Sequence, residues 1–145
     1  AFTVCIHAES VQAQEVQHVL TLESFAAFAK KRQLKAMIVD DIEFNLFVLA
    51  NSLNKLGIQL TSVARNGQEA FDFYKSQIEK NQRLDVITLD IDMPIMDGKK
   101  ALKLIRNYEM EFRLKPCIIV MVSANCSESE IQDCLVGEGE TNEQL

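Results

Sequence analysis

The stretch Asp90-Ile-Asp-Met-Pro-Ile-Met-Asp-Gly98 decides the fold, because an apolar run at residues 84–89 delivers a carboxylate straight into a loop rich in turn formers. The apolar run predicts a buried strand, and the proline and glycine that follow predict its end. Asp90 is therefore expected at the carboxyl end of a strand. In open α/β sheets, this edge is where ligands bind.

A second acidic motif supports this interpretation. Another short apolar run, residues 34–39, ends in the pair Asp40-Asp41. Two parallel strands would bring these carboxylates and Asp90 together at one edge of the sheet. Such a cluster repels itself unless a hard cation lies within it, and Mg²⁺ prefers oxygen ligands. The sequence thus predicts a magnesium site.

From residue 34 onward, apolar strand candidates alternate with amphipathic helices, a pattern typical of a parallel sheet covered on both faces. The expected strands are residues 34–39, 58–63, 84–89 and 117–122. The expected helices lie between Asp41 and Gly57, after Asn66-Gly67, after Gly98, and after a capping box that runs from Ser127 to Glu130. The predicted fold class is therefore α/β.

Length and composition fit one soluble domain, since the 145 residues are 48% apolar. The net charge of −6 argues against nucleic-acid binding, which needs clustered Lys and Arg. No apolar run approaches the roughly 20 residues that span a bilayer, so no membrane contact is expected, and we expect a cytoplasmic location. The four cysteines form no CxxC pair and have no histidine at metal-ligand spacing, which favours reduced structural thiols.

Several motifs, in this order, resemble the receiver domain of two-component response regulators, above all the receivers of hybrid sensor histidine kinases. The resemblance covers roughly residues 34–135 and implies a flavodoxin-like, doubly wound parallel sheet. The motifs are Asp40-Asp41, Asn45, Ala64-Arg-Asn-Gly-Gln-Glu-Ala70, Asp90 with Met93-Pro94 and Met96-Asp97-Gly98 behind it, and Ser123-Ala124 after the fourth expected strand.

The resemblance implies a role for each matched residue. Asp90 would be the phosphoacceptor. It would be phosphorylated by a histidine kinase or a phosphotransfer domain, which could belong to the same parent chain. Ser123 would be the switch hydroxyl. The expected Mg²⁺ ligands are Asp40, Asp41, Asp90 and the backbone carbonyl of Asp92. Asn45 has a simpler possible role, a hydrogen bond to a nearby backbone group.

The sequence departs from the family toward its end. The family has a fifth strand with a Lys-Pro pair and then a helix, whereas no lysine follows Lys115 here. We therefore expect a receiver domain at 34–145 that is truncated before the fifth strand, with residues 117–122 forming a sheet edge. Residues 1–33 are expected to be an N-terminal extension or linker, strand-like at 2–7 and helical at 11–32. This segment is either the end of a kinase ATP-binding domain or an ordinary extension.

Two other functions remain open. A pseudo-receiver would keep the fold as a binding or structural module without being phosphorylated, and the missing lysine favours it. A haloacid-dehalogenase-type phosphatase would use Asp90 as nucleophile and Asp92 as general acid, but Asp40-Asp41 and the loop that follows Asp92 favour the receiver. The chain has no glycine-rich ATP lid, so we expect a module that is not itself a conventional enzyme, in a parent that could be a histidine kinase.

Overall fold

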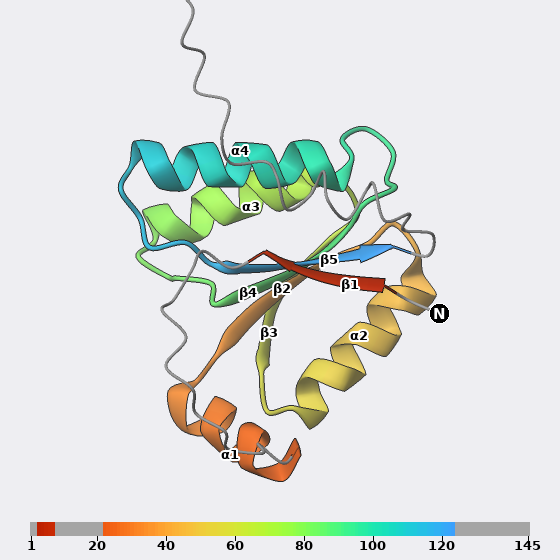
Figure 1. The fold of residues 1–145 in the computed structure, drawn as a ribbon, viewed down its shortest axis with the longest axis vertical. Helices are drawn as coiled ribbons and strands as arrows, with labels where there is room; N and C mark the ends of the chain where they lie inside the picture. The colour runs from red at the N-terminus through yellow and green to blue at the C-terminus, as the bar shows by residue number, and fades with distance from the viewer. Residues whose placement is uncertain (1–2, 8–21, 124–145) are drawn as a thin grey trace, which may run out of the picture.

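The computed structural model describes residues 3–7 and 22–123, which form one central sheet with helices on both sides (Figure 1). Along the chain, the elements are β1 (Thr3–His7), α1 (Leu22–Arg32), β2 (Lys35–Val39), α2 (Glu43–Lys55), β3 (Gln59–Ala64), α3 (Gly67–Glu79), β4 (Val86–Asp90), α4 (Gly98–Glu111) and β5 (Ile118–Ser123).

The sheet confirms the predicted α/β class. Its strand order is β1-β5-β4-β2-β3, and the four strands from β2 to β5 are parallel. Each of the four expected strands is present, with boundaries displaced by no more than two residues. The helix expected after the capping box at Ser127 lies outside the described residues.

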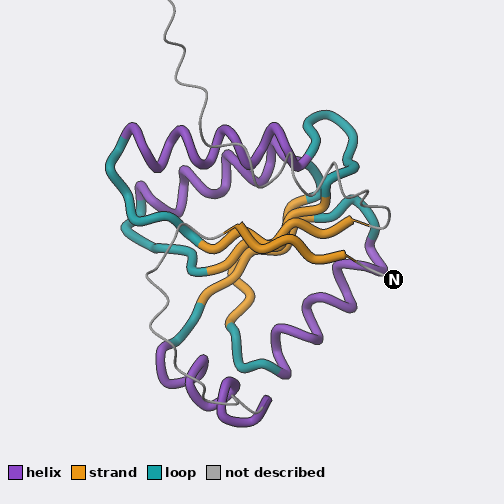
Figure 2. Tube along the Cα trace, viewed as in Figure 1, coloured by secondary structure: helices purple, strands orange, loops and turns teal. Residues whose placement is uncertain are grey.

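Helices lie against both faces of the sheet (Figure 2), and an apolar cluster fills each interface. On one face, α3 and α4 cover the strands through side chains such as Tyr74, Ala101 and Ile105. On the other face, α2 packs Leu46 and Leu53 against Ile38 of β2. In α3, α4 and α2, the buried residues recur at helical spacing, which is the pattern that predicted these helices.

Gly57 ends α2 as predicted, and the reason is conformational and steric. Its φ is +71°, a value that glycine adopts without strain. A β-carbon at this position would lie 2.7 Å from the carbonyl oxygen of Ala26, so α1 can approach the turn only because no side chain is there. The helix α1 thus packs in the same apolar cluster as α2, through the buried Ala29.

The expectation that residues 117–122 form a sheet edge is wrong. The N-terminal strand β1 pairs antiparallel with β5 along its length, from Thr3 opposite Ser123 to His7 opposite Ile119. The strand expected at residues 2–7 is thus present, and it belongs to the same sheet as the four parallel strands. The derivation of residues 1–33 from a kinase domain stays a prediction.

None of the helices described here combines the length and the apolar character that crossing a membrane requires.

Candidate acidic site at the carboxyl edge of the sheet

Three carboxylates meet where β2 and β4 end. Asp40, Asp41 and Asp90 each offer an oxygen, and these atoms all lie within 4.8 Å of one another. The sheet register explains this proximity: Val39 of β2 lies opposite Leu89 of β4, so Asp40 and Asp90 follow the same pair of neighbouring residues. The two acidic motifs of the sequence are therefore one site in space.

Asp40 is the fixed member of this cluster. It is only 2% exposed, and its carboxylate accepts a hydrogen bond of 2.9 Å from the backbone N–H of Ile42. The Asn45 side chain donates to both carboxylate oxygens of Asp40, at 3.1 and 3.2 Å. The interpretation of Asn45 as a partner of a local backbone group is wrong, since it orients an acidic side chain of the site. Its place in the first turn of α2, five residues after Asp40, was the available signal.

Asp41 and Asp90 are more exposed than Asp40, and the pKa of Asp90 is shifted. Partial burial raises the pKa of Asp90 to about 6, and the negative charges of Asp40 and Asp41 add to this effect. Backbone hydrogen bonds from Asp92 and Ile91 oppose the rise in pKa. Among the ion pairs between described residues, none involves these three carboxylates, so the cluster keeps its mutual repulsion.

Ser123 and Asp92 occupy different positions around this cluster. Ser123 is the last residue of β5 and is buried, and Val122 beside it lies opposite Asp90 in the sheet. Asp92 is exposed and does not belong to the three-carboxylate group. Its backbone N–H contacts Asp90, as the pKa of that residue reflects.

Gly98 brings the loop back over the strand end. A β-carbon there would lie 2.1 Å from the carbonyl oxygen of Asp90, and the Gly98 N–H donates to the Ile91 carbonyl at 2.9 Å. Asp97 caps the helix that follows, accepting from the Lys100 N–H at 2.8 Å. The loop can therefore approach the end of β4 this closely only because Gly98 has no side chain.

The donor set fits Mg²⁺. Carboxylate oxygens are the ligands this ion prefers, and it is commonly held by one or two carboxylates together with water and phosphate oxygens. A divalent cation would also relieve the repulsion that raises the pKa of Asp90. The residues present thus meet the chemical requirements of a magnesium site.

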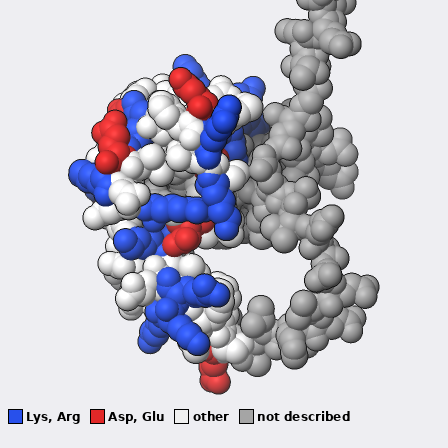
Figure 3. Space-filling model, turned by 90° about the vertical axis from the view of Figure 1, so that its left-hand side faces the viewer, with Lys and Arg blue, Asp and Glu red and all other residues white. Residues whose placement is uncertain are grey.

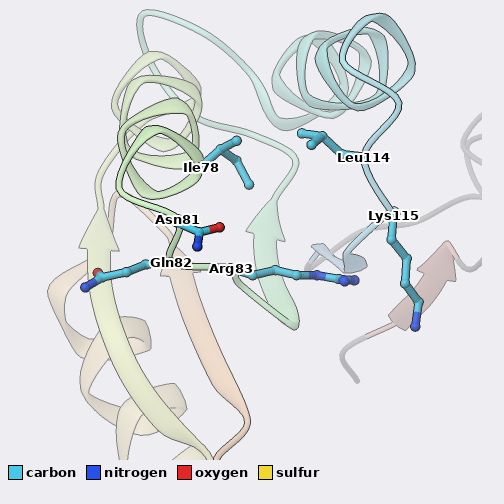
Figure 4. A pocket seen from close by; sticks show the side chains of 6 residues that line it. All are labelled: Ile78, Asn81, Gln82, Arg83, Leu114 and Lys115. Atoms are coloured by element: carbon cyan, nitrogen blue, oxygen red, sulfur yellow. The ribbon is translucent and has the colours of Figure 1, made fainter.

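A separate hollow lies at the other end of the sheet, where the strands begin (Figure 4). It is bounded by the chain that follows α3 and α4, and its lining comprises Ile78, Asn81, Gln82, Arg83, Leu114 and Lys115. None of the three clustered carboxylates lines it, so it is not part of the acidic site.

Comparisons with known proteins agree with this geometry. The model of the response regulator receiver domain matches residues 36–141. Hybrid signal transduction histidine kinase A of Dictyostelium discoideum is 40% identical over 101 residues, which are 70% of this chain and 4% of that protein. Chemotaxis protein CheY of Bacillus subtilis is 34% identical over 101 residues, covering 70% of this chain and 76% of CheY.

Solved structures show the same fold. The CheX–CheY–BeF₃–Mg²⁺ complex of Borrelia burgdorferi matches with a TM-score of 0.61 and 29% identity, covering 72% of this chain and 78% of the matched chain. The receiver domain of the Arabidopsis thaliana histidine kinase CKI1, complexed with Mg²⁺ and BeF₃⁻, matches with a TM-score of 0.63 over 77% of this chain and 79% of the matched chain; at 24% identity, it supports the fold alone. This chain spans only a small part of the hybrid kinases that it matches. From the acidic cluster, the sheet and the family match over residues 36–141, we conclude that the chain belongs to the response regulator receiver domain family.

Proposed function

We propose that this chain is a phosphoacceptor module of a two-component phosphorelay, with Asp90 as the residue that receives the phosphoryl group. The observation that carries the proposal is the meeting of the Asp40, Asp41 and Asp90 oxygens within 4.8 Å at the edge where ligands bind in such sheets. The relationship to hybrid histidine kinases supports a phosphohistidine as the donor.

The proposed reaction is a transfer between two side chains. A carboxylate oxygen of Asp90 attacks the phosphorus of a phosphohistidine, the P–N bond breaks, and the histidine leaves with the electron pair of that bond and takes up a proton from solvent. Transfer of this kind depends on positioning and on charge stabilisation more than on covalent chemistry by the protein. Asp40, held by Asn45 and Ile42, keeps the cluster in register during the transfer.

Mg²⁺, when bound, would neutralise charge on the phosphoryl oxygens. The proposed ligands are Asp41 and Asp90, the buried Asp40 acting directly or through water, and the backbone carbonyl of Asp92. Ser123 is the proposed hydroxyl that contacts the phosphoryl group, which its position one residue beyond the partner of Asp90 supports.

The surface beside the site supports a protein as the donor. On the first two turns of α2 and just before it, large apolar side chains are exposed: Ile42 at 53%, Phe44 at 71%, Phe47 at 66% and Val48 at 44%. Exposed apolar groups gathered on one surface are typical of protein contact sites. We propose that the histidine kinase or phosphotransfer domain contacts this part of α2, and that the encounter takes place in the cytoplasm.

The test compares three carboxylate variants after treatment with a small phosphodonor and Mg²⁺. Asp90→Asn should abolish the added phosphoryl group in the intact mass, whereas Asp92→Asn should have a mild effect because only its main-chain carbonyl is used. Asp72→Asn, on the outer surface of α3, is the matched control and should label like the unmodified chain. Severe loss with Asp92→Asn would instead favour a phosphatase in which that residue is the general acid.

One observation favours a second candidate. The sequence has no lysine after Lys115, so a charge-assisted contact that the family uses to hold the phosphoryl group is missing from these 145 residues. A pseudo-receiver of this kind would bind partners without phosphorylation. Binding of Mg²⁺ with no labelling of Asp90 by any phosphodonor would support it.

A further inference from the structure

The N-terminal strand β1 does not carry the acidic residues, but it pairs with β5, which ends beside the acidic site. On its inner side, β5 pairs with β4 as far as Val122, which lies opposite Asp90. The register with β4 stops there, and the strand partner of Ser123 is Thr3 of β1. The last residue of β5 is therefore paired within the sheet by β1 and not by β4.

The metal ligands depend on other strands. Asp40 and Asp41 follow β2, and Asp90 ends β4, and these two strands pair directly with each other. In the order of the sheet, β5 separates β1 from β4 and β2. A change in β1 thus acts on the end of β5 while the strands that carry the carboxylates keep their mutual pairing.

We propose that β1 is a positioning strand for the phosphoryl side of the site: by pairing Thr3 with Ser123, it orders the end of β5 so that the Ser123 hydroxyl is in place when a phosphoryl group binds at Asp90. The inference rests on the function proposed above. Ordering before binding lowers the entropic cost of binding, which is the general benefit of preorganisation. Mg²⁺ binds at the ends of β2 and β4, so its affinity does not depend on the order of β5.

The size of the effect follows from how much chain must be ordered. If the end of β5 loses its strand partner, the backbone of about one residue is fixed at the moment of binding, which weakens a phosphoryl analogue roughly tenfold. The affinity for Mg²⁺ alone should change by less than about twofold, since none of its proposed ligands is in β5 or β1. A general loss of stability would not produce this split.

Two adjacent proline variants test the proposal, because successive backbone N–H groups of a strand point to opposite sides. Val122 accepts from the Ile91 N–H, so its backbone groups face β4 and those of Met121 face β1. Cys5, opposite Met121, therefore has its N–H toward β5, and Cys5→Pro removes that donor. Val4→Pro removes a donor at the open edge, where proline is tolerated. Each variant is titrated with Mg²⁺, then with beryllofluoride in saturating Mg²⁺. Cys5→Pro should lose about tenfold in beryllofluoride affinity, and Val4→Pro should match the unmodified chain.

A reciprocal measurement on the unmodified chain decides the matter if a proline variant unfolds. Coupling between two parts of a molecule is mutual, so beryllofluoride should slow amide hydrogen exchange in β1 as well as in β5. Equal beryllofluoride affinity in both folded variants would overturn the inference and leave the proposed function intact. An amide exchange rate in β1 that does not change when beryllofluoride binds would do the same. Failure of the unmodified chain to bind beryllofluoride at all would overturn the proposed function, and this inference with it.

Discussion

Gly98 shows how strongly one residue can constrain the acidic site. We predict that Gly98→Ala lowers the free energy of unfolding by about 1–3 kcal/mol. The new methyl group would lie 2.1 Å from the backbone of Asp90, so the backbone must shift at both residues. Mg²⁺ affinity should fall as well, since the displaced residue supplies a carboxylate. Urea unfolding and Mg²⁺ titration measure the two effects. Lys103→Ala, an exposed change in the same helix, should leave both quantities unchanged.

Asp90 makes stability depend on pH in an unusual direction. Its folded-state pKa of about 6 lies above the ordinary value, so the folded chain binds this proton more tightly than the unfolded chain does. The metal-free protein should therefore gain stability from this group as the pH falls through about 6 toward about 4. At neutral pH, the repulsion within the ionised cluster lowers the stability of the folded metal-free chain.

Thermal melts of the metal-free chain and of Asp90→Asn test this direction. The melting temperature of the unmodified chain should rise relative to that of the variant as the pH falls from about 7 to about 5. Saturating Mg²⁺ should reverse the trend, because its ligands must be ionised and protons compete with it. Parallel curves for the two proteins without metal would show that Asp90 has an ordinary pKa.

At the scale of elements, a buried network joins α3, α4 and the start of β5. Glu109 of α4 is 2% exposed and accepts hydrogen bonds from the Tyr74 hydroxyl at 2.9 Å and from the Cys117 N–H at 2.8 Å. Arg106 donates to the other Glu109 oxygen at 2.6 Å and to the Cys117 carbonyl at 2.9 Å. Burial raises the pKa of the Cys117 thiol to about 12, so this cysteine stays protonated, in line with a structural role.

We predict that Glu109→Ala costs about 3–5 kcal/mol of stability, because it leaves Arg106 without its buried partner. Mg²⁺ affinity should hardly change in chains that remain folded, since the network lies where β5 begins and the acidic site lies where β4 ends. Urea unfolding gives the first quantity and metal titration the second. Glu111→Ala, an exposed change two residues along the same helix, is the control; if it costs as much as Glu109→Ala, the network has no special role.

The sequence predicted elements whose signals are local. The apolar runs located β2 to β5, and the helical spacing of Ala70 and Tyr74 or of Ala101 and Ile105 located the helices that cover one face. The acidic motifs could be combined because parallel strands share a carboxyl edge. The spacing of Asn45 from Asp40 was a signal for their contact, but the hydrogen bonds themselves depend on the rotamers of both side chains, which the sequence does not give.

The position of β1 could not be predicted for a different reason. The alternation of residues 2–7 indicates a strand but carries no information about its partner. Pairing with β5 joins segments far apart in the chain, and β5 has an apolar character that would suit several neighbours. A local pattern therefore predicted the element, and only the folded sheet could show its place.

Across the whole molecule, the edge of the sheet where the strands begin carries many basic side chains (Figure 3). Figure 3 faces this edge, and basic side chains are spread over it with acidic side chains among them. The basic side chains include Lys30, Lys31 and Arg32 in the last turn of α1, and Arg83 and Lys115 beside the hollow. The acidic site lies a strand length away, roughly 15 Å. That distance exceeds the screening length of about 8 Å at physiological salt, so the two edges act almost independently there.

The pairing of β1 with β5 also bears on the order in which the polypeptide is made. Roughly 120 residues separate Thr3 from Ser123, so at about 5–20 residues per second on the ribosome, β1 exists for roughly 6–24 s before its partner is synthesised. The intervening strands can assemble meanwhile, because β2, β3 and β4 pair with one another. Pairing of β1 with β5 is thus a late event in biogenesis. Until then Thr3–His7 is a strand segment without its partner strand, and chaperones or neighbouring nascent chains can bind it.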